Sequence, residues 1–243
     1  MYSWKIIRTV CSILLLLPLV HVTYIISRNT LETLDSSPLA WTREINAYAA
    51  SDSTQALPEK PVVVVGGQRV KLWFGLADVL APRPVIMRGL GDAIVEDITF
   101  HYARLIGFYR PDTVVLLPSA SEFFIRDSKS AQDLLEAVVA LVEQDAKHGV
   151  TRKFYVFTPI KTPGRPQSNI TIDQSVALLK IWASTRNGTE VLDANSLLTD
   201  TEGTPLARYF RGDGTNLNEH GYLRLAVLLQ QQLEADAIPV PQV

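Results

Sequence analysis

The chain has 243 residues, of which 47% are hydrophobic and 20% are charged, and its formal net charge is −2 at pH 7. This length accommodates one α/β domain with an N-terminal extension, and the hydrophobic content excludes a largely disordered chain. The near-neutral charge lacks the strongly basic character that nucleic-acid binding requires. A single cysteine, Cys11, excludes an intramolecular disulfide, and the four histidines are too scattered for a metal site, so no cofactor is predicted.

Residues 6–27 are almost wholly apolar and follow a short basic start, residues 1–5. About 20 apolar residues in a helix match the thickness of a bilayer's hydrocarbon core. A cleaved signal peptide is the alternative, but the first small-x-small site, Ala47-Tyr48-Ala49, comes about twenty residues too late. We therefore predict one transmembrane signal anchor over 6–27. The positive charge before it places residues 1–5 in the cytoplasm and the remaining chain on the periplasmic or extracellular side.

Residues 28–60 are polar and are predicted to form a stalk with one helix over 38–49. Beyond them, apolar runs alternate with segments of helical periodicity. The runs predict strands over 61–65, 85–87, 113–117, 154–157 and 189–192, and the periodic segments predict helices over 93–108, 129–148, 172–185 and 218–235. Such alternation indicates a three-layer α/β/α sandwich around a five-stranded parallel sheet. We expect this domain to cover 61–235, followed by a tail over 236–243.

In open parallel sheets the functional crevice lies at the carboxyl ends of the strands. Five segments with recognisable sequence motifs lie at or beside these ends, in chain order. They are VVGGQR (64–69), RGLGD (88–92), RPDTVVL (110–116), IKTPGR (160–165) and FRGDGTNLNEHGY (210–222).

Together these segments resemble the SGNH (GDSL-type) esterase family, over residues 61–230. The corresponding family motifs are, in the same order, a strand followed by G-D-S, then R-G-F-G-G, then P-D-x-V-V before G-x-N-D. The fourth is I-K-P-S-x-x-R, found in a lysophospholipase-like and acetylhydrolase-like branch, and the fifth is F-x-x-D-G-x-H-L-N-x-x-G-Y. The resemblance implies the flavodoxin-like fold of SGNH hydrolases. It also implies acyl transfer by a serine nucleophile, a histidine base and an aspartate, with an oxyanion hole of backbone N–H groups and an asparagine.

The chain departs from this family at most of the positions that carry the chemistry. The acid is retained as Asp213, whereas the nucleophile serine falls on Gln68, the base histidine on Asn216, the oxyanion asparagine on Ser121, and the second-block glycine on Gly91 or, without a gap, on Asp92. An amide is neither an activatable nucleophile nor a base near neutral pH. We therefore predict a catalytically degenerate domain that binds or docks at the cell envelope.

Two alternatives stay open. The first is an active esterase on lipid or glycan esters with a rearranged site, for which Ser121, His220 and Asp213 are the candidate triad. The second is a structural partner of another membrane protein. Three polar residues near the predicted crevice are candidate contacts for a glycan ester, a lipid ester or an envelope protein: Asp92, Lys161 and Arg165.

Overall fold

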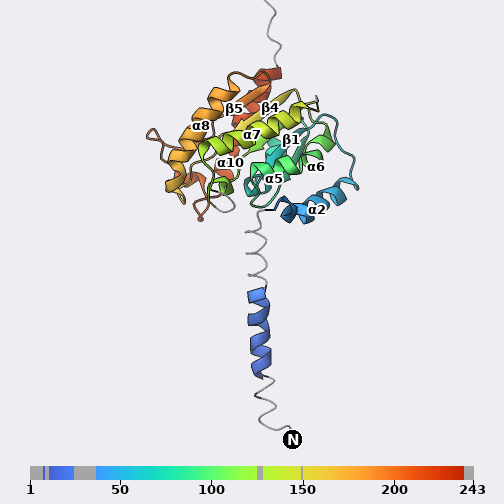
Figure 1. Ribbon diagram of the computed structural model, residues 1–243, viewed down its shortest axis with the longest axis vertical. Coiled ribbons are helices and arrows are strands. Elements are labelled where there is room, and N and C mark those ends of the chain that lie inside the picture. Colours follow the sequence, from blue (N-terminus) through green and yellow to red (C-terminus); the bar gives the residue numbers. More distant parts are fainter. Residues whose placement is uncertain (1–7, 9–10, 25–36, 125–127, 149, 238–243) are drawn as a thin grey trace, which may run out of the picture.

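The computed structural model describes residues 8, 11–24, 37–124, 128–148 and 150–237. A parallel sheet of five strands lies at its centre, between two layers of helices (Figure 1). The strands are β1 (Val62–Gly66), β2 (Val85–Gly89), β3 (Thr113–Leu117), β4 (Lys153–Phe157) and β5 (Thr189–Leu192), in the order β2-β1-β3-β4-β5. The predicted α/β architecture is confirmed. Since the order reverses at β1, a crevice is expected between the carboxyl ends of β1 and β3.

The central strands are built from β-branched and aliphatic residues because both of their faces are covered. Every residue of β1 and β3 is buried. Alternate side chains enter the two cores: Val63 and Val65 pack into one, and Val62 and Val64 into the other. The sequence run VVVV thus serves both faces of the sheet.

A separate set of helices covers each face of the sheet. One face carries the longer α2 (Thr42–Asp52), α7 (Ala131–Ala146) and α8 (Asn169–Ala183) with the short α5 (Val95–Phe100) and α6 (Tyr102–Leu105). The other carries α3 (Gln68–Lys71), α4 (Leu76–Val79), α9 (Asn195–Leu198) and the long α10 (Glu219–Ala237). Short 3₁₀ turns occur at η1 (Pro38–Trp41), η2 (Gly107–Tyr109), η3 (Ala120–Phe123), η4 (Pro166–Ser168) and η5 (Ala207–Tyr209).

The helix predicted over 93–108 is divided into α5, α6 and η2. The backbone of His101 leaves the helical region, at φ −93° and ψ 15°. Its imidazole Nε2 lies 2.8 Å from the carbonyl oxygen of Pro38. The break therefore coincides with a contact to the segment that precedes α2, which a local pattern cannot reveal.

Helix α2 lies within the range predicted as a stalk, but it packs on the domain. Trp41 enters the core, and the Tyr48 hydroxyl donates to the carbonyl of Gly89 at 2.5 Å. At the end of α2, the Asp52 carboxylate pairs with Arg88 Nη2 and Arg104 Nη2, both at 2.5 Å. The predicted helix over 38–49 is thus present as η1 and α2, and it belongs to the folded domain because these contacts are largely buried.

The apolar N-terminal segment is described in part. Residues 8 and 11–24 are helical, and their large apolar side chains are exposed, for example Leu15 at 72%. Among the described residues, no helix is both long enough and apolar enough to cross a membrane. The rest of the predicted span, namely 6, 7, 9, 10 and 25–27, lies outside the described residues, as do residues 1–5, the first part of the predicted stalk (28–36) and most of the predicted tail (238–243).

Candidate functional site

The first predicted site residue, Gln68, begins helix α3 directly after β1. The intervening Gly67 has no room for a side chain, since an added Cβ would lie 2.7 Å from Ser119 Oγ and 2.9 Å from the carbonyl oxygen of Ala93. The loops that follow β1, β2 and β3 therefore meet at Gly67. The sheet thus brings Gln68 to the edge where the family resemblance places a nucleophile.

The loop before α10 holds Asp213 and Asn216 as a fixed pair. The Asp213 carboxylate accepts three hydrogen bonds of 2.8 Å, from the backbone N–H groups of Thr215 and Asn216 and from Asn216 Nδ2. Burial acts to raise the pKa of the Asp213 carboxyl, but these hydrogen bonds, the Asn216 amide first, hold it below its ordinary value. Asn216 therefore contacts the acid as a base histidine would, but its amide group cannot take up a proton near neutral pH.

The predicted oxyanion positions already have acceptors within the protein. The buried Ser121 donates its hydroxyl to Asp92 Oδ1 at 3.4 Å. The Gly91 N–H donates to Glu44 Oε2 of α2 at 3.2 Å. The ring of Trp41 closes over Gly91, whose added Cβ would lie 2.6 Å from Trp41 Cζ3. A carboxylate oxygen thus accepts the N–H group that the family resemblance assigns to an oxyanion hole.

Arg69, which the sequence did not single out, is buried beside Gln68 with 2% exposure. Its Nη2 donates to the carbonyl of Thr215 at 3.3 Å, whereas its buried Nε has no acceptor among the described residues. Burial lowers the pKa of the Arg69 guanidinium to about 10, and Tyr222 and Asp213 oppose this shift. An unsatisfied buried donor costs about 1–3 kcal/mol.

A small cavity of about 10 Å³ lies against Arg69. Such a volume holds about one water molecule. Its lining comes from the loops after β1, β3 and β4: Arg69, Ser119, Ala120, Phe123, Phe124, Ile160, Thr162, Arg165, Ser168 and Ile172. The crevice expected at this edge is therefore almost filled by side chains.

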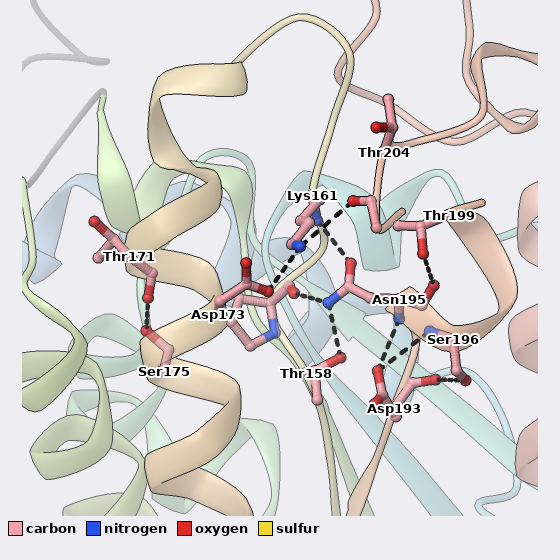
Figure 2. Close-up of polar contacts among 12 residues, drawn as sticks. Thr158, Lys161, Thr171, Asp173, Ser175, Asp193, Asn195, Ser196, Thr199 and Thr204 are labelled. Atoms are coloured by element: carbon pink, nitrogen blue, oxygen red, sulfur yellow. Dashed lines mark hydrogen bonds and ion pairs between the residues drawn. The ribbon is translucent and has the colours of Figure 1, made fainter. Parts of the chain in front are cut away.

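Of the candidate ligand contacts, Lys161 already has an ion-pair partner within the protein. The Lys161 Nζ lies 2.7 Å from Asp173 Oδ1 and 3.4 Å from the carbonyl oxygen of Gly203 (Figure 2). The backbone N–H of Lys161 donates to Asn195 Oδ1 at 2.9 Å. Asn195 Nδ2 in turn donates to the carbonyl of Pro159 at 2.8 Å. This cluster joins the loop after β4 to α8 and α9, so Lys161 has a structural role.

The other two candidate contacts differ from Lys161. Asp92 accepts the Ser121 hydroxyl at 3.4 Å. The Arg165 guanidinium stacks over the Phe124 ring at 4.1 Å and lines the same cavity as Arg69. Of the three candidate contacts, Arg165 is therefore the one that lines this cavity.

The rearranged triad is not brought together. Ser121 is buried against Asp92, and Asp213 is engaged by Asn216. His220 is exposed on α10 and lines a separate hollow of about 560 Å³ with Arg208 and other residues, which includes neither Ser121 nor Asp213. The described residues also contain no group of three or more His, Cys, Asp and Glu side chains able to hold a metal ion.

An ion cluster supports the loop that follows Ser121. The fully buried Glu122 carboxylate accepts the Val95 N–H at 3.0 Å and pairs with Lys129 Nζ at 2.5 Å, and Lys129 Nζ also pairs with Glu96 at 2.5 Å. These contacts fasten η3 to the first turn of α5. Acidic residues near the site thus have structural partners, which the sequence pattern did not reveal.

No protein-family model and no curated protein matches this chain. Solved structures do match it. A putative platelet activating factor from Streptococcus pneumonia superposes with a TM-score of 0.71 at 15% identity, over 88% of this chain and 99% of that one. A putative acylhydrolase from Bacteroides fragilis gives 0.69 at 19% identity, over 79% and 96%.

A GDSL-like lipase from Bacteroides thetaiotaomicron gives a TM-score of 0.64 at 16% identity, over 79% of this chain and 98% of that one. The neighbours are thus GDSL-like lipases and acylhydrolases of the SGNH fold, and this chain has that fold. The fold predicted from the five sequence segments is confirmed. At these identities the likeness shows the fold, and function has to be argued from the site.

Proposed function

We propose that this chain is a membrane-anchored SGNH-fold protein without hydrolase activity, whose domain acts by binding or docking at the cell envelope. The observation that carries the proposal is the Asp213–Asn216 pair, in which an amide occupies the place of the base, with Gln68 in the place of the nucleophile. Loss of a triad member alone costs roughly 10⁴–10⁶ in kcat. Neither replacement offers a group that could take over the lost step.

The occupied oxyanion positions support the same proposal. Glu44 accepts the Gly91 N–H, and Asp92 accepts the Ser121 hydroxyl. Both acceptors are carboxylates, so a tetrahedral intermediate with its own negative charge would meet repulsion where an esterase provides donors. The anchoring and the outward placement of the domain rest on the apolar run over 6–27 and on the basic residues before it.

The assay for this proposal is ester hydrolysis by the full chain purified in mild detergent. With p-nitrophenyl acetate and butyrate at pH 7, we expect the release of nitrophenol to equal the buffer rate. Ser121→Ala and His220→Ala should leave that rate unchanged. Turnover that is lost in either variant would overturn the proposal and support a rearranged esterase site.

A second variant separates the missing triad from the occupied oxyanion positions. Gln68→Ser combined with Asn216→His restores the nucleophile and the base, yet we expect no measurable hydrolysis, because Glu44 still accepts the Gly91 N–H and position 121 still has no amide donor. Adding Glu44→Gln and Ser121→Asn removes one carboxylate and supplies the missing amide donor, so turnover should first appear in this fourfold variant. Turnover that is already present in the double variant would contradict the proposal that Glu44 blocks the oxyanion position. Circular dichroism and Tm serve as controls for folding.

A further inference from the structure

Arg69 is a buried cation with no ion-pair partner among the described residues. In the part of the chain that the structure describes, it forms no ion pair, and its one side-chain hydrogen bond goes to the neutral carbonyl of Thr215. Its Nε is buried and has no acceptor. Buried charges in proteins are ordinarily paired. Among the described residues, the guanidinium therefore has no directly bound anion.

Three carboxylates of the neighbouring loops and helices are already engaged. Asp213 accepts three hydrogen bonds within its own loop. Glu122 pairs with Lys129, and Asp173 pairs with Lys161. Since each of these carboxylates is held by other donors, none of the three binds the Arg69 guanidinium directly.

The cavity beside Arg69 is suited to one oxygen atom. Its volume of about 10 Å³ is close to that of a single water. A second guanidinium, Arg165, and the hydroxyl groups of Ser119, Thr162 and Ser168 also line it. Arg165 and Phe124, which both line the cavity, are partly exposed and stacked at 4.1 Å.

We propose that this cavity binds one anionic oxygen of a carboxylate- or phosphate-bearing ligand, held between Arg69 and Arg165, with the rest of the ligand outside against Phe124. A water molecule would satisfy the N–H group but not the charge, whereas an anionic oxygen does both. Guanidinium groups are the side chains best matched to carboxylate and phosphate oxygens. This inference rests on the proposed binding function and names the chemical class of its ligand.

The test is thermal unfolding of the full chain in detergent, titrated with sodium acetate, inorganic phosphate and the neutral ester methyl acetate. For wild type, either anion should raise Tm in a saturable way, by about 5–10 °C at 100-fold above its Kd. Acetate and phosphate distinguish a carboxylate ligand from a phosphate ligand. Methyl acetate should have no effect and should not be hydrolysed.

Two variants and one control make the assignment specific. Arg69→Met should abolish the anion response, and without anion its Tm should equal or exceed that of wild type, because an unpaired buried charge is removed. Arg165→Gln keeps Arg69 and should weaken the anion affinity at least about tenfold. The matched control is Arg224→Gln, since Arg224 also stacks on a ring, Tyr209 at 4.6 Å, but does not line this cavity. Its titration should match wild type.

The results that would contradict these proposals can be told apart. No response of wild type to either anion, or equal responses in wild type and Arg69→Met, would overturn the anion site. A methyl acetate response equal to that of acetate would overturn the anionic specificity and leave binding at this edge intact. Hydrolysis of methyl acetate would overturn the proposed non-catalytic function itself.

Discussion

Replacement of Lys129 by methionine is expected to lower the free energy of unfolding by about 3–5 kcal/mol. Lys129 is the ammonium partner of the fully buried Glu122, at 2.5 Å. Without Lys129 the carboxylate keeps the Val95 N–H as a donor but has no counter-charge. Urea denaturation at pH 7, followed by circular dichroism, measures the effect.

The matched control for this variant is Glu96→Gln. Glu96 binds the same ammonium at 2.5 Å, but its side chain is 48% exposed, so its loss should cost no more than about 1 kcal/mol. Equal destabilisation by Glu96→Gln and Lys129→Met would contradict the assignment of the buried pair as the stabilising contact.

The pH dependence of this cluster has a definite sign. Burial raises the pKa of the Glu122 carboxyl to about 7 from its ordinary 4.5, while Lys129 acts to lower it. Between these values the folded protein holds a proton that the unfolded chain has released, so this group makes stability fall as pH rises. Removing Lys129 raises the pKa of Glu122 further. The loss of stability in Lys129→Met should therefore be larger at pH 8 than at pH 5.

Replacement of Asp52 by alanine is the second large expected effect, at about 3–5 kcal/mol of unfolding free energy. The Asp52 side chain is 5% exposed and pairs with Arg88 and Arg104 at 2.5 Å, and it also accepts the Tyr109 hydroxyl. Its loss leaves two partly buried guanidinium groups without an anion. We expect α2 to detach before the sheet unfolds, so limited proteolysis should cut the chain near residues 53–60 in Asp52→Ala and spare wild type.

The control for Asp52 is Asp112→Ala. Asp112 also pairs with an arginine, Arg152 at 3.1 Å, but the two side chains are 36% and 59% exposed. Exposed pairs contribute about 0–1 kcal/mol, so this variant should keep the protease resistance of wild type. If both aspartates cost the same, α2 would not be held by the buried cluster.

The strands could be predicted because their signal is local. Buried parallel strands require uninterrupted apolar runs, and the run over 61–65 corresponds to β1 at Val62–Gly66 with a shift of one residue. The long helices carry an equally local periodicity, and the one predicted over 218–235 is α10 at Glu219–Ala237. The short helices α3, α4 and α9 were not predicted, since four residues are too few to show a helical period.

The candidate site could be predicted only in part, because its contacts join distant segments. Asp213 and Asn216 lie three residues apart, and the resemblance placed them together. Glu44 reaches Gly91 across 47 positions, and Arg69 reaches the carbonyl of Thr215 across 146. No spacing rule links such pairs, and a single sequence does not show that Arg69 is buried.

The docking of α2 limits how far the domain can lie from the proposed membrane anchor. Trp41 and Glu44 contact Gly91, so the chain enters the folded domain at the same edge of the sheet as Gln68. In the anchored arrangement proposed above, nine residues (28–36) separate the anchor from the described domain, and a chain of nine residues spans at most about 32 Å. Tethering of this kind gives effective concentrations in the millimolar range for a target on the same surface. A weak anion site at this edge would then suffice to hold a ligand in the envelope layer directly above the bilayer.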